Sequence, residues 1–464
     1  MVSFADVTSD KQDARCDKLE EDDWSAEFDR WLTPFLLEFS HKAQRKWAPT
    51  YLHGLIAPGE RKSVEPMAER VCQGETQQLH HFVATSTWDT AGHECVLLEK
   101  AAEIVSGPDA HLIFDDTGIP KKGEHSAGVA HQYCGQLGKN ANCQVFVSAT
   151  LARNDVPVPV ALRLYLPKEW ADDFERRKKT NIPDKITFRT KWQIALDEID
   201  RIMQSNVVFG DVLADAGYGV CIEFRQGLSR RNLKWAVGVQ PETLVFSKSV
   251  EVTFSPKVHK KGRKPLIGKA SESPVKVEEL FAAYSDQNFV DISWRDGTKG
   301  PLTLAFAAIR VRAADGPRVV DHNHGPGDEI WLVCEKRPNG ERKYHFSNYE
   351  ADMDLQTLVS IIKARWPCEQ AHQQLKEELG LDHFEGRSWH GIHHHALLTM
   401  ISFAFMQHLR LRANTQNSPA NCNQTDLRLC TRQKPRIQCP QSCSVIERHR
   451  VACQKTHGAP RPAA

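Results

Sequence analysis

Two adjacent aspartates, Asp115 and Asp116, follow the apolar run Leu112-Ile113-Phe114. Two like charges a few ångströms apart repel each other unless a cation neutralises them. A strand followed by an Asp-rich turn is the ordinary explanation for such a pair. Carboxylates at the end of a buried strand are also suitable ligands for a divalent cation. The pair alone leaves both explanations open, and acids elsewhere in the chain must decide between them.

Two further acids could join such a site. Asp215, in the sequence LADAGYG, ends another apolar run, and Glu369 lies in a helical pattern. Arg365 and Lys376 lie on the same helical face as Glu369. A glutamate that is merely exposed to solvent would not require two basic residues on its own face, so this arrangement favours a functional role for Glu369. Mg²⁺ prefers oxygen ligands, and a pair of such ions can activate the attacking oxygen and stabilise the leaving oxygen of a phosphodiester. We therefore predict a Mg²⁺ site, which Mn²⁺ could also fill, at Asp116, Asp215 and Glu369.

Asp115 and Asp116 compete for the first position of this site. Successive side chains of a strand point to opposite faces, so only one of the two can face the other acids.

The elements around these acids follow a recognisable order. The pattern predicts helices over 24–105, strands at 112–116, 142–152 and 156–167, a helix at 187–204, a strand at 207–219, a helix at 224–233, a strand at 234–246, and helices at 354–379 and 393–412. This is the succession of an RNase H-like α/β core. In that fold the first strand and the end of the fourth lie side by side, and the last helix packs across them, so acids at those places would converge.

The chain divides into five predicted parts. They are a helical N-terminal part that binds DNA ends (1–105), the first part of the RNase H-like core (106–246), a β-rich insertion (247–346), the final core helices (347–412) and a basic tail without a predicted fold (413–464).

The composition of the 464 residues is that of an ordinary globular chain, with 41% hydrophobic and 26% charged residues. The acidic N-terminus has no apolar segment, the apolar runs are too short for a bilayer, and the 13 cysteines lack a regular spacing. These features predict a cytoplasmic protein that does not associate with a membrane. Residues 255–272 hold six bases and one acid, and residues 414–464 hold eight bases and two acids, as phosphate contacts would require.

Several motifs in their order resemble those of bacterial insertion-sequence transposases of the DDE superfamily, most closely the group called insertion sequence seven-oh-one. They are DDTGIPKKG, QYCGQLGKNANCQV, LADAGYG, SWRDGTKG and LKEELGLDHFEGRSWHGIHHHALL, with the pattern R-x₃-E-x₆-K. The resemblance covers the chain from about Tyr51 to about Arg412. It implies cut-and-paste movement of DNA, in which metal-bound water nicks a transposon end and the freed 3′-hydroxyl attacks target DNA.

The resemblance also implies a role for each motif residue. The aspartate directly before the threonine of the D-T motif is the metal ligand, which gives Asp116 that role, with Asp215 and Glu369 as the other ligands. Arg365 and Lys376 match basic residues that contact DNA phosphates. The partners implied are the inverted-repeat ends, the target DNA and a second copy of the chain in the synaptic complex.

Three positions need a separate comment. The related Y-x₂-R-x₃-E-x₆-K signature would place its tyrosine at position 362, where this chain has Ile362. This departure argues against a hairpin intermediate held by that tyrosine. Trp294 of SWRDGTKG could stack on a flipped base or be a core tryptophan of the insertion, and we favour the core slightly. Lys299 of the same motif is a predicted phosphate contact.

Two other functions compete with an active transposase. One is a non-catalytic DNA-binding relic or regulator that occupies element ends, which a divergent tail would suit. The other is a general RNase H-like nuclease, which would not need the basic insertion. Consecutive histidines at 393–395 point about 100° apart on a helix, so we do not predict zinc there.

Overall fold

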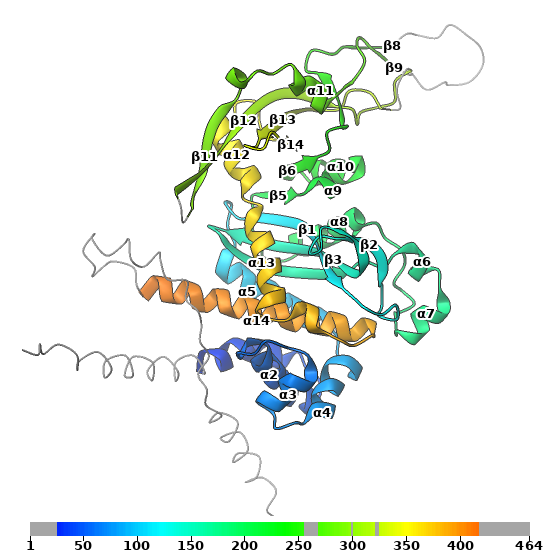
Figure 1. Cartoon of the computed structure of the whole chain (residues 1–464), viewed down its shortest axis with the longest axis vertical. Coiled ribbons are helices and arrows are strands. Elements are labelled where there is room, and N and C mark those ends of the chain that lie inside the picture. Colours follow the sequence, from blue (N-terminus) through cyan, green and yellow to red (C-terminus); the bar gives the residue numbers. More distant parts are fainter. Residues whose placement is uncertain (1–25, 255–267, 298–299, 321–323, 417–464) are drawn as a thin grey trace, which may run out of the picture.

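The structure is a computed structural model that describes residues 26–254, 268–297, 300–320 and 324–416. Its described part is mixed α/β, as predicted from the sequence, and is built around one twelve-stranded sheet. Figure 1 shows the long helix α14 (Trp389–Gln416) between a group of N-terminal helices and this sheet. None of the described helices has the length and apolarity that crossing a membrane would require.

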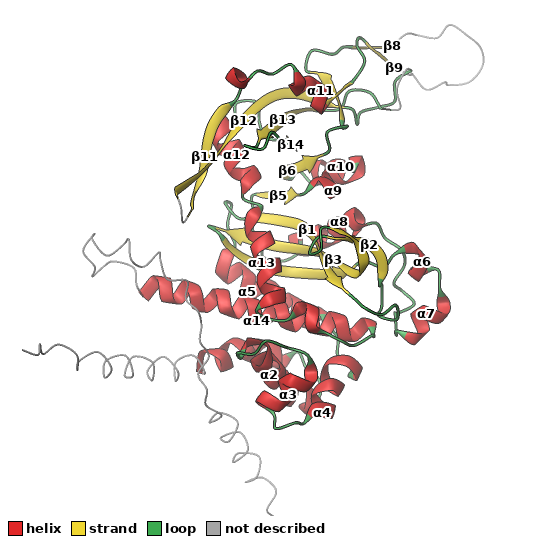
Figure 2. Cartoon of the chain, in the orientation of Figure 1, coloured by secondary structure: helices red, strands yellow, loops and turns green. Residues whose placement is uncertain are grey.

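Helices make up the N-terminal part and cover the sheet, as Figure 2 shows in red. Residues 26–37 are helical. The α-helices that follow are α2 (Lys42–Ile56), α3 (Val64–Val71), α4 (Thr76–His80), α5 (Ala91–Val105), α6 (Lys168–Ala171), α7 (Phe174–Lys179), α8 (Lys191–Met203), α9 (Ala216–Gly219), α10 (Ile222–Arg230), α11 (Val277–Ala282), α12 (Leu355–Lys363), α13 (Trp366–Glu377) and α14.

The sheet order is β10-β7-β12-β13-β14-β6-β5-β1-β3-β2, with β4 also paired to β3 and β11 to β12. Its strands are β1 (His111–Pro120), β2 (Ala130–Cys134), β3 (Lys139–Arg153), β4 (Val156–Leu164), β5 (Asp211–Ala214), β6 (Lys234–Val239), β7 (Leu244–Ser247), β10 (Val275–Lys276), β11 (Val290–Gly297), β12 (Gly300–Ala313), β13 (Glu329–Lys336) and β14 (Arg342–Ser347). A separate pair is formed by β8 (Val252–Phe254) and β9 (Gly268–Ala270).

The centre of the sheet places β1 beside β5, which confirms the prediction that the first and fourth core strands are neighbours. The two strands are parallel, and each residue of His111–Phe114 pairs with the residue one hundred positions later, up to Phe114 with Ala214. On its other edge β1 pairs with the antiparallel β3. β5 ends at Ala214, whereas β1 continues to Pro120, so Asp115 and Asp116 lie within β1, just beyond the point where β5 ends and not at the end of the first strand as predicted.

Apolar side chains on the two faces of β1 contact different helices. Ile113 packs in one cluster with Leu213, Leu358 and Cys368, so α12 and α13 cover this face. Leu112 belongs to the main core, which also contains residues of α8 and α10. Because side chains alternate along a strand, the β1 side chains on one face lie toward α12 and α13, and those on the other face lie toward α8 and α10.

The predicted helix 354–379 is in fact two helices. α12 ends at Lys363 and α13 starts at Trp366, with Pro367 in its first turn. Proline lacks the N–H that an uninterrupted helix would bond, but it fits the first turn of a new helix. Pro367 therefore accounts for two helices where one was predicted.

Apart from the β8–β9 pair, the strands of the segment predicted as an insertion (247–346) belong to the core sheet. Its strand β14 pairs with β6, so β12, β13 and β14 continue the core sheet outward. β2 was missed by the sequence patterns, and the fourth predicted strand is reduced to Asp211–Ala214. The predicted tail (413–464) lies almost wholly outside the described residues.

His395 connects the N-terminal helices to the rest of the chain through two hydrogen bonds. One ring nitrogen contacts the Tyr51 hydroxyl of α2 at 2.9 Å, and the other contacts the carbonyl oxygen of Gly380 at 2.9 Å. A neutral imidazole that donates to Gly380 and accepts from Tyr51 satisfies both contacts. Burial lowers the pKa of His395 to about 4.

We predict that acid weakens the folded state through His395. Between pH 7 and 5 the unfolded chain binds a proton at this ring, whose ordinary pKa is about 6.5, whereas the folded chain does not. The free energy of unfolding should fall by about 2 kcal/mol from this group. Denaturant unfolding at both pH values should show a smaller fall for His395→Gln, whereas the exposed His80→Gln should behave like the unaltered chain. An equal fall in all three proteins would contradict this role.

Candidate active site

The register of β1 against β5 brings Asp115 and Asp215 together. Phe114 pairs with Ala214, so Asp115 and Asp215 follow at the next position of the two parallel strands. Residues at matching positions of parallel strands point to the same face. Asp215 also caps the short helix α9 by accepting from the backbone N–H groups of Gly217 at 3.0 Å and Tyr218 at 3.3 Å.

Helix α13 adds Glu369 to this group through Arg365. The Arg365 guanidinium donates to Asp115 Oδ2 at 2.6 Å and also to the Glu369 carboxylate. Burial disfavours the charged guanidinium, but Asp115 and Glu369 outweigh this effect and raise the pKa of Arg365. The side chain of Asp115 is 14% exposed and that of Glu369 is 51% exposed, so the group is open on the Glu369 side.

Asp116 points away from these acids and has partners of its own. Its Oδ2 accepts from Lys191 of α8 at 2.5 Å, and its Oδ1 accepts from the Tyr218 hydroxyl at 2.7 Å. The structure therefore brings Asp215 and Glu369 together with Asp115. It places the side chain of Asp116 on the opposite face of β1.

The carboxylates repel one another because they are close and poorly solvated. Burial raises the pKa of Asp215 to about 6, and the charges of Asp115 and Asp116 add to the effect. Burial also raises the pKa of Asp115 against the influence of Arg365, with further contributions from Asp116 and Glu369. A divalent cation would relieve this repulsion, and an all-oxygen donor set suits Mg²⁺ or Mn²⁺. Asp115, Asp215 and Glu369 would supply such oxygen donors.

Lys376, predicted to contact DNA, lies two turns along α13 on the same side. It is half-buried, and burial lowers its pKa, which the charges of Asp382, Cys134 and Asp115 partly offset. Lys376 thus adds a second cation to Arg365 beside the acids.

The predicted DNA contacts of the insertion differ in their surroundings. Trp294 is partly buried, lies edge-on to Phe306 at 6.0 Å between ring centroids, and has the Lys363 ammonium 4.6 Å from its ring centre. This packing agrees with the core role that we favoured from the sequence. Lys299 lies outside the described residues, and its phosphate contact stays a prediction.

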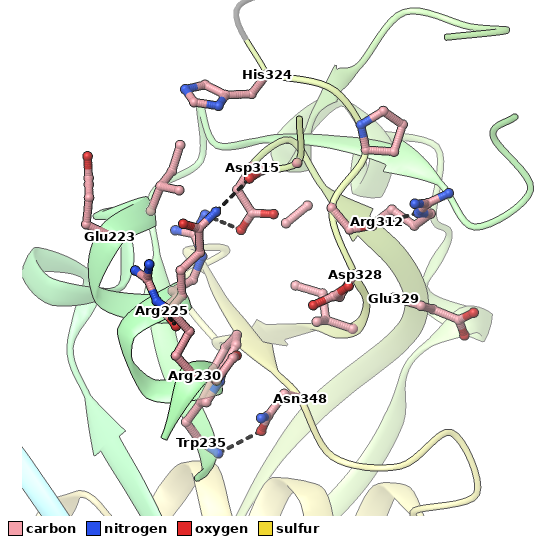
Figure 3. Close-up of a pocket in the computed structure, with 18 of the residues that line it drawn as sticks. Glu223, Arg225, Arg230, Trp235, Arg312, Asp315, His324, Asp328, Glu329 and Asn348 are labelled. Atoms are coloured by element: carbon pink, nitrogen blue, oxygen red, sulfur yellow. Dashed lines mark hydrogen bonds and ion pairs between the residues drawn. The ribbon is translucent and has the colours of Figure 1, made fainter. Parts of the chain in front are cut away.

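An open pocket of about 1450 Å³ lies away from the acids, between α10 and the chain around Asp315 (Figure 3). Its buried Arg225 donates to Asp315 at 2.9 Å, and Arg312 donates to the carbonyl oxygen of Gly327 at 2.7 Å. These charges are partnered within the protein, and the pocket includes none of Asp115, Asp215 and Glu369.

Sequence patterns missed several neighbours of the acids. Ser148 and His372 contact each other behind Asp115, and Lys191 and Tyr218 bind Asp116. These residues come from four distant parts of the chain and share no motif. The choice between Asp115 and Asp116 had no such signal, because it depends on the register of β1 against β5, in which Asp115 and Asp215 directly follow the paired residues Phe114 and Ala214.

Comparisons with known proteins point to one family. Residues 34–301 match the family model described as DDE superfamily endonuclease. A relative from Microchaete diplosiphon, named "Probable transposase for insertion sequence element IS701", is 33% identical over 192 residues, which are 41% of this chain and 48% of that protein. The alignment thus spans about half of the relative's length.

A solved structure of a piggyBac transposase synaptic complex with hairpin DNA aligns with 82% of this chain and 68% of its own. The two sequences are 8% identical and the TM-score is 0.41, a likeness too weak to support an argument.

We predict that Asp115→Asn lowers the pKa of Asp215 from about 6 toward its ordinary value. The substitution removes a like charge while burial remains. NMR titration of aspartate carboxyl carbons in the metal-free protein measures the shift. Asp109→Asn, which removes an exposed aspartate paired with Arg153, should leave Asp215 unchanged. An ordinary pKa for Asp215 in the unaltered protein would contradict the proposed crowding of carboxylates.

Proposed function

Because the chain belongs to the DDE superfamily endonuclease family, we propose that it is a metal-dependent DNA transposase. It would cleave DNA at the ends of an insertion sequence and join the freed ends to target DNA. The relative with 33% identity, itself named as a transposase, supports this choice within the family.

One observation supports the proposal most directly. The parallel register of β1 and β5 gives Asp115 and Asp215 matching positions, and Arg365 ties Glu369 to Asp115. Three carboxylates, one within β1, one directly after β5 and one from α13, thus share one side of the sheet. Carboxylates are gathered in this way where a cation is to be held.

We propose Asp115, in place of Asp116, as the first metal ligand. Both oxygens of Asp116 already accept hydrogen bonds, from Lys191 and Tyr218, on the other face of β1. Its role is to hold α8 and the start of α9 against the sheet.

Mg²⁺, with Mn²⁺ as a substitute, is the cofactor that suits the donors. When bound, it would supply an activated oxygen nucleophile and a stabilised leaving oxygen. Asp115, Asp215 and Glu369 would hold it. Asp215 must be ionised to do so, and its raised pKa of about 6 makes cation binding compete with protons below neutral pH.

Arg365 and Lys376 would bind DNA phosphates beside the acids. Arg365 now neutralises two carboxylates, and a cation in the site would take over that role. Its planar guanidinium could then bind a phosphate through two hydrogen bonds. Lys376 would supply a single charge farther along α13.

The remaining parts receive roles by the same proposal. The order of elements from 106 to 412 would be an RNase H-like core interrupted by the insertion, and the N-terminal helices would bind the element ends. Two copies of the chain would assemble to cut two ends together, and stacking of Trp294 on DNA is not required.

We predict that Asp115→Asn, Asp215→Asn and Glu369→Gln each reduce cleavage by roughly a thousandfold or more but keep end binding, since each removes one metal ligand. Asp116→Asn is the matched control one residue away. It should keep cleavage, and it should lower the free energy of unfolding by about 1 kcal/mol through the weakened Lys191 contact. A plasmid excision assay with the flanking inverted repeats, paired with gel-shift binding, measures both effects.

Other results would favour other functions. Binding of ends without cleavage by the unaltered chain in Mg²⁺ or Mn²⁺ would identify a DNA-binding relic. Equal cleavage of DNA that lacks the repeats would identify a general nuclease. Loss of cleavage in Asp116→Asn, with normal cleavage in Asp115→Asn, would return the first ligand to Asp116.

A further inference from the structure

We propose that Asp115, Cys368 and His372 form a second cation site that takes a thiophilic divalent ion such as Zn²⁺. Their ligand atoms all lie within 4.8 Å of one another. Cys368 and His372 are one turn apart on α13, and both side chains are directed at the face of β1 that carries Asp115.

The donor set distinguishes this site from the carboxylate site. A thiolate, an imidazole and one carboxylate match the preference of Zn²⁺, whereas Mg²⁺ prefers oxygen ligands alone. Three protein ligands would leave one tetrahedral position for water. The thiol of Cys368 would release its proton to solvent as the metal–sulfur bond forms.

The present spacing requires little movement. Cys368 Sγ lies 3.6 Å from His372 Nε2. A zinc ion with bonds of about 2.3 Å to sulfur and about 2.0 Å to nitrogen holds these two atoms about 3.5 Å apart. Ser148 Oγ lies 2.7 Å from His372 Nε2, so zinc bound to this nitrogen would replace that hydrogen bond, and Thr150 Oγ1 lies 3.4 Å from Cys368 Sγ.

Asp115 belongs to both sites, and this sharing has a consequence. Cys368 is fully buried and His372 is 7% exposed, so Zn²⁺ would sit on the inner side of the Asp115 carboxylate. It would compete with Arg365 and with the proposed catalytic cation for that carboxylate. Zn²⁺ should therefore inhibit Mg²⁺-dependent cleavage, a consequence that rests on the proposed function although the binding itself does not.

The binding test uses the full chain with the tail cysteines at 422, 430, 439, 443 and 453 changed to serine, because these could bind zinc on their own. Co²⁺, as a probe for Zn²⁺, should give a thiolate-to-metal absorption band that Zn²⁺ displaces. The band should disappear in Cys368→Ser, and His372→Gln should weaken binding about tenfold or more. The matched control Cys95→Ser removes an exposed thiol elsewhere and should keep the band.

X-ray absorption at the zinc edge tests the same site without substituting any of its residues, and covers the case in which Cys368→Ser does not fold. It should show one sulfur ligand among nitrogen and oxygen ligands. No sulfur, two or more sulfurs, or a Co²⁺ band that survives in folded Cys368→Ser would overturn the proposal.

Cleavage assays separate this site from the proposed function. The ratio of cleavage with and without added Zn²⁺ should be lowest in the unaltered chain and closer to one in Cys368→Ser. Zinc binding through Cys368 in a chain that does not cleave DNA would support the zinc site and contradict the proposed transposase function. DNA cleavage by a chain that shows no thiolate band would support the transposase function and contradict the zinc site.

Discussion

Repulsion among carboxylates at the point where β1 runs past the carboxyl end of β5 is the constraint around which this structure is arranged. Asp115 and Asp215 occupy matching positions of two parallel strands, and burial with mutual repulsion raises the pKa of both. Without a cation, Arg365 supplies the compensating charge and connects Asp115 to Glu369. The restart of the helix after α12 matters because it makes Arg365 the N-cap residue of α13 and sets Glu369 in the first turn of that helix.

The two faces of β1 have different roles. Asp115 lies with α13 and faces the acids and the Cys368–His372 pair, whereas Asp116 lies with α8 and is held by Lys191 and Tyr218. A doubled aspartate therefore serves two purposes, one proposed to be chemical and one structural. The same arrangement puts hard and soft donors on either side of a single carboxylate. This sharing would make the proposed catalytic site sensitive to the identity of the metal available.

The outer parts of the chain support this centre from two directions. The N-terminal helices reach the core through α14, where His395 connects α2 to the chain just after α13. The strands of the predicted insertion continue the central sheet through β14 and β6. Trp294 helps to join that extension to α12, because it packs against Phe306 and Lys363. These contacts lie on either side of α13, at Lys363 before it and at Gly380 after it.

Local patterns in the sequence predicted the α/β class, the adjacency of the first and fourth core strands and the grouping of Asp215 with Glu369. Each of these depends on periodicity within a segment or on the order of elements along the chain. Only the tertiary structure decided which of Asp115 and Asp116 joins them, because strand register is fixed by pairing between distant segments. For the same reason the merging of the insertion into the core sheet and the meeting of Asp115 with Cys368 and His372 could not be predicted from the sequence.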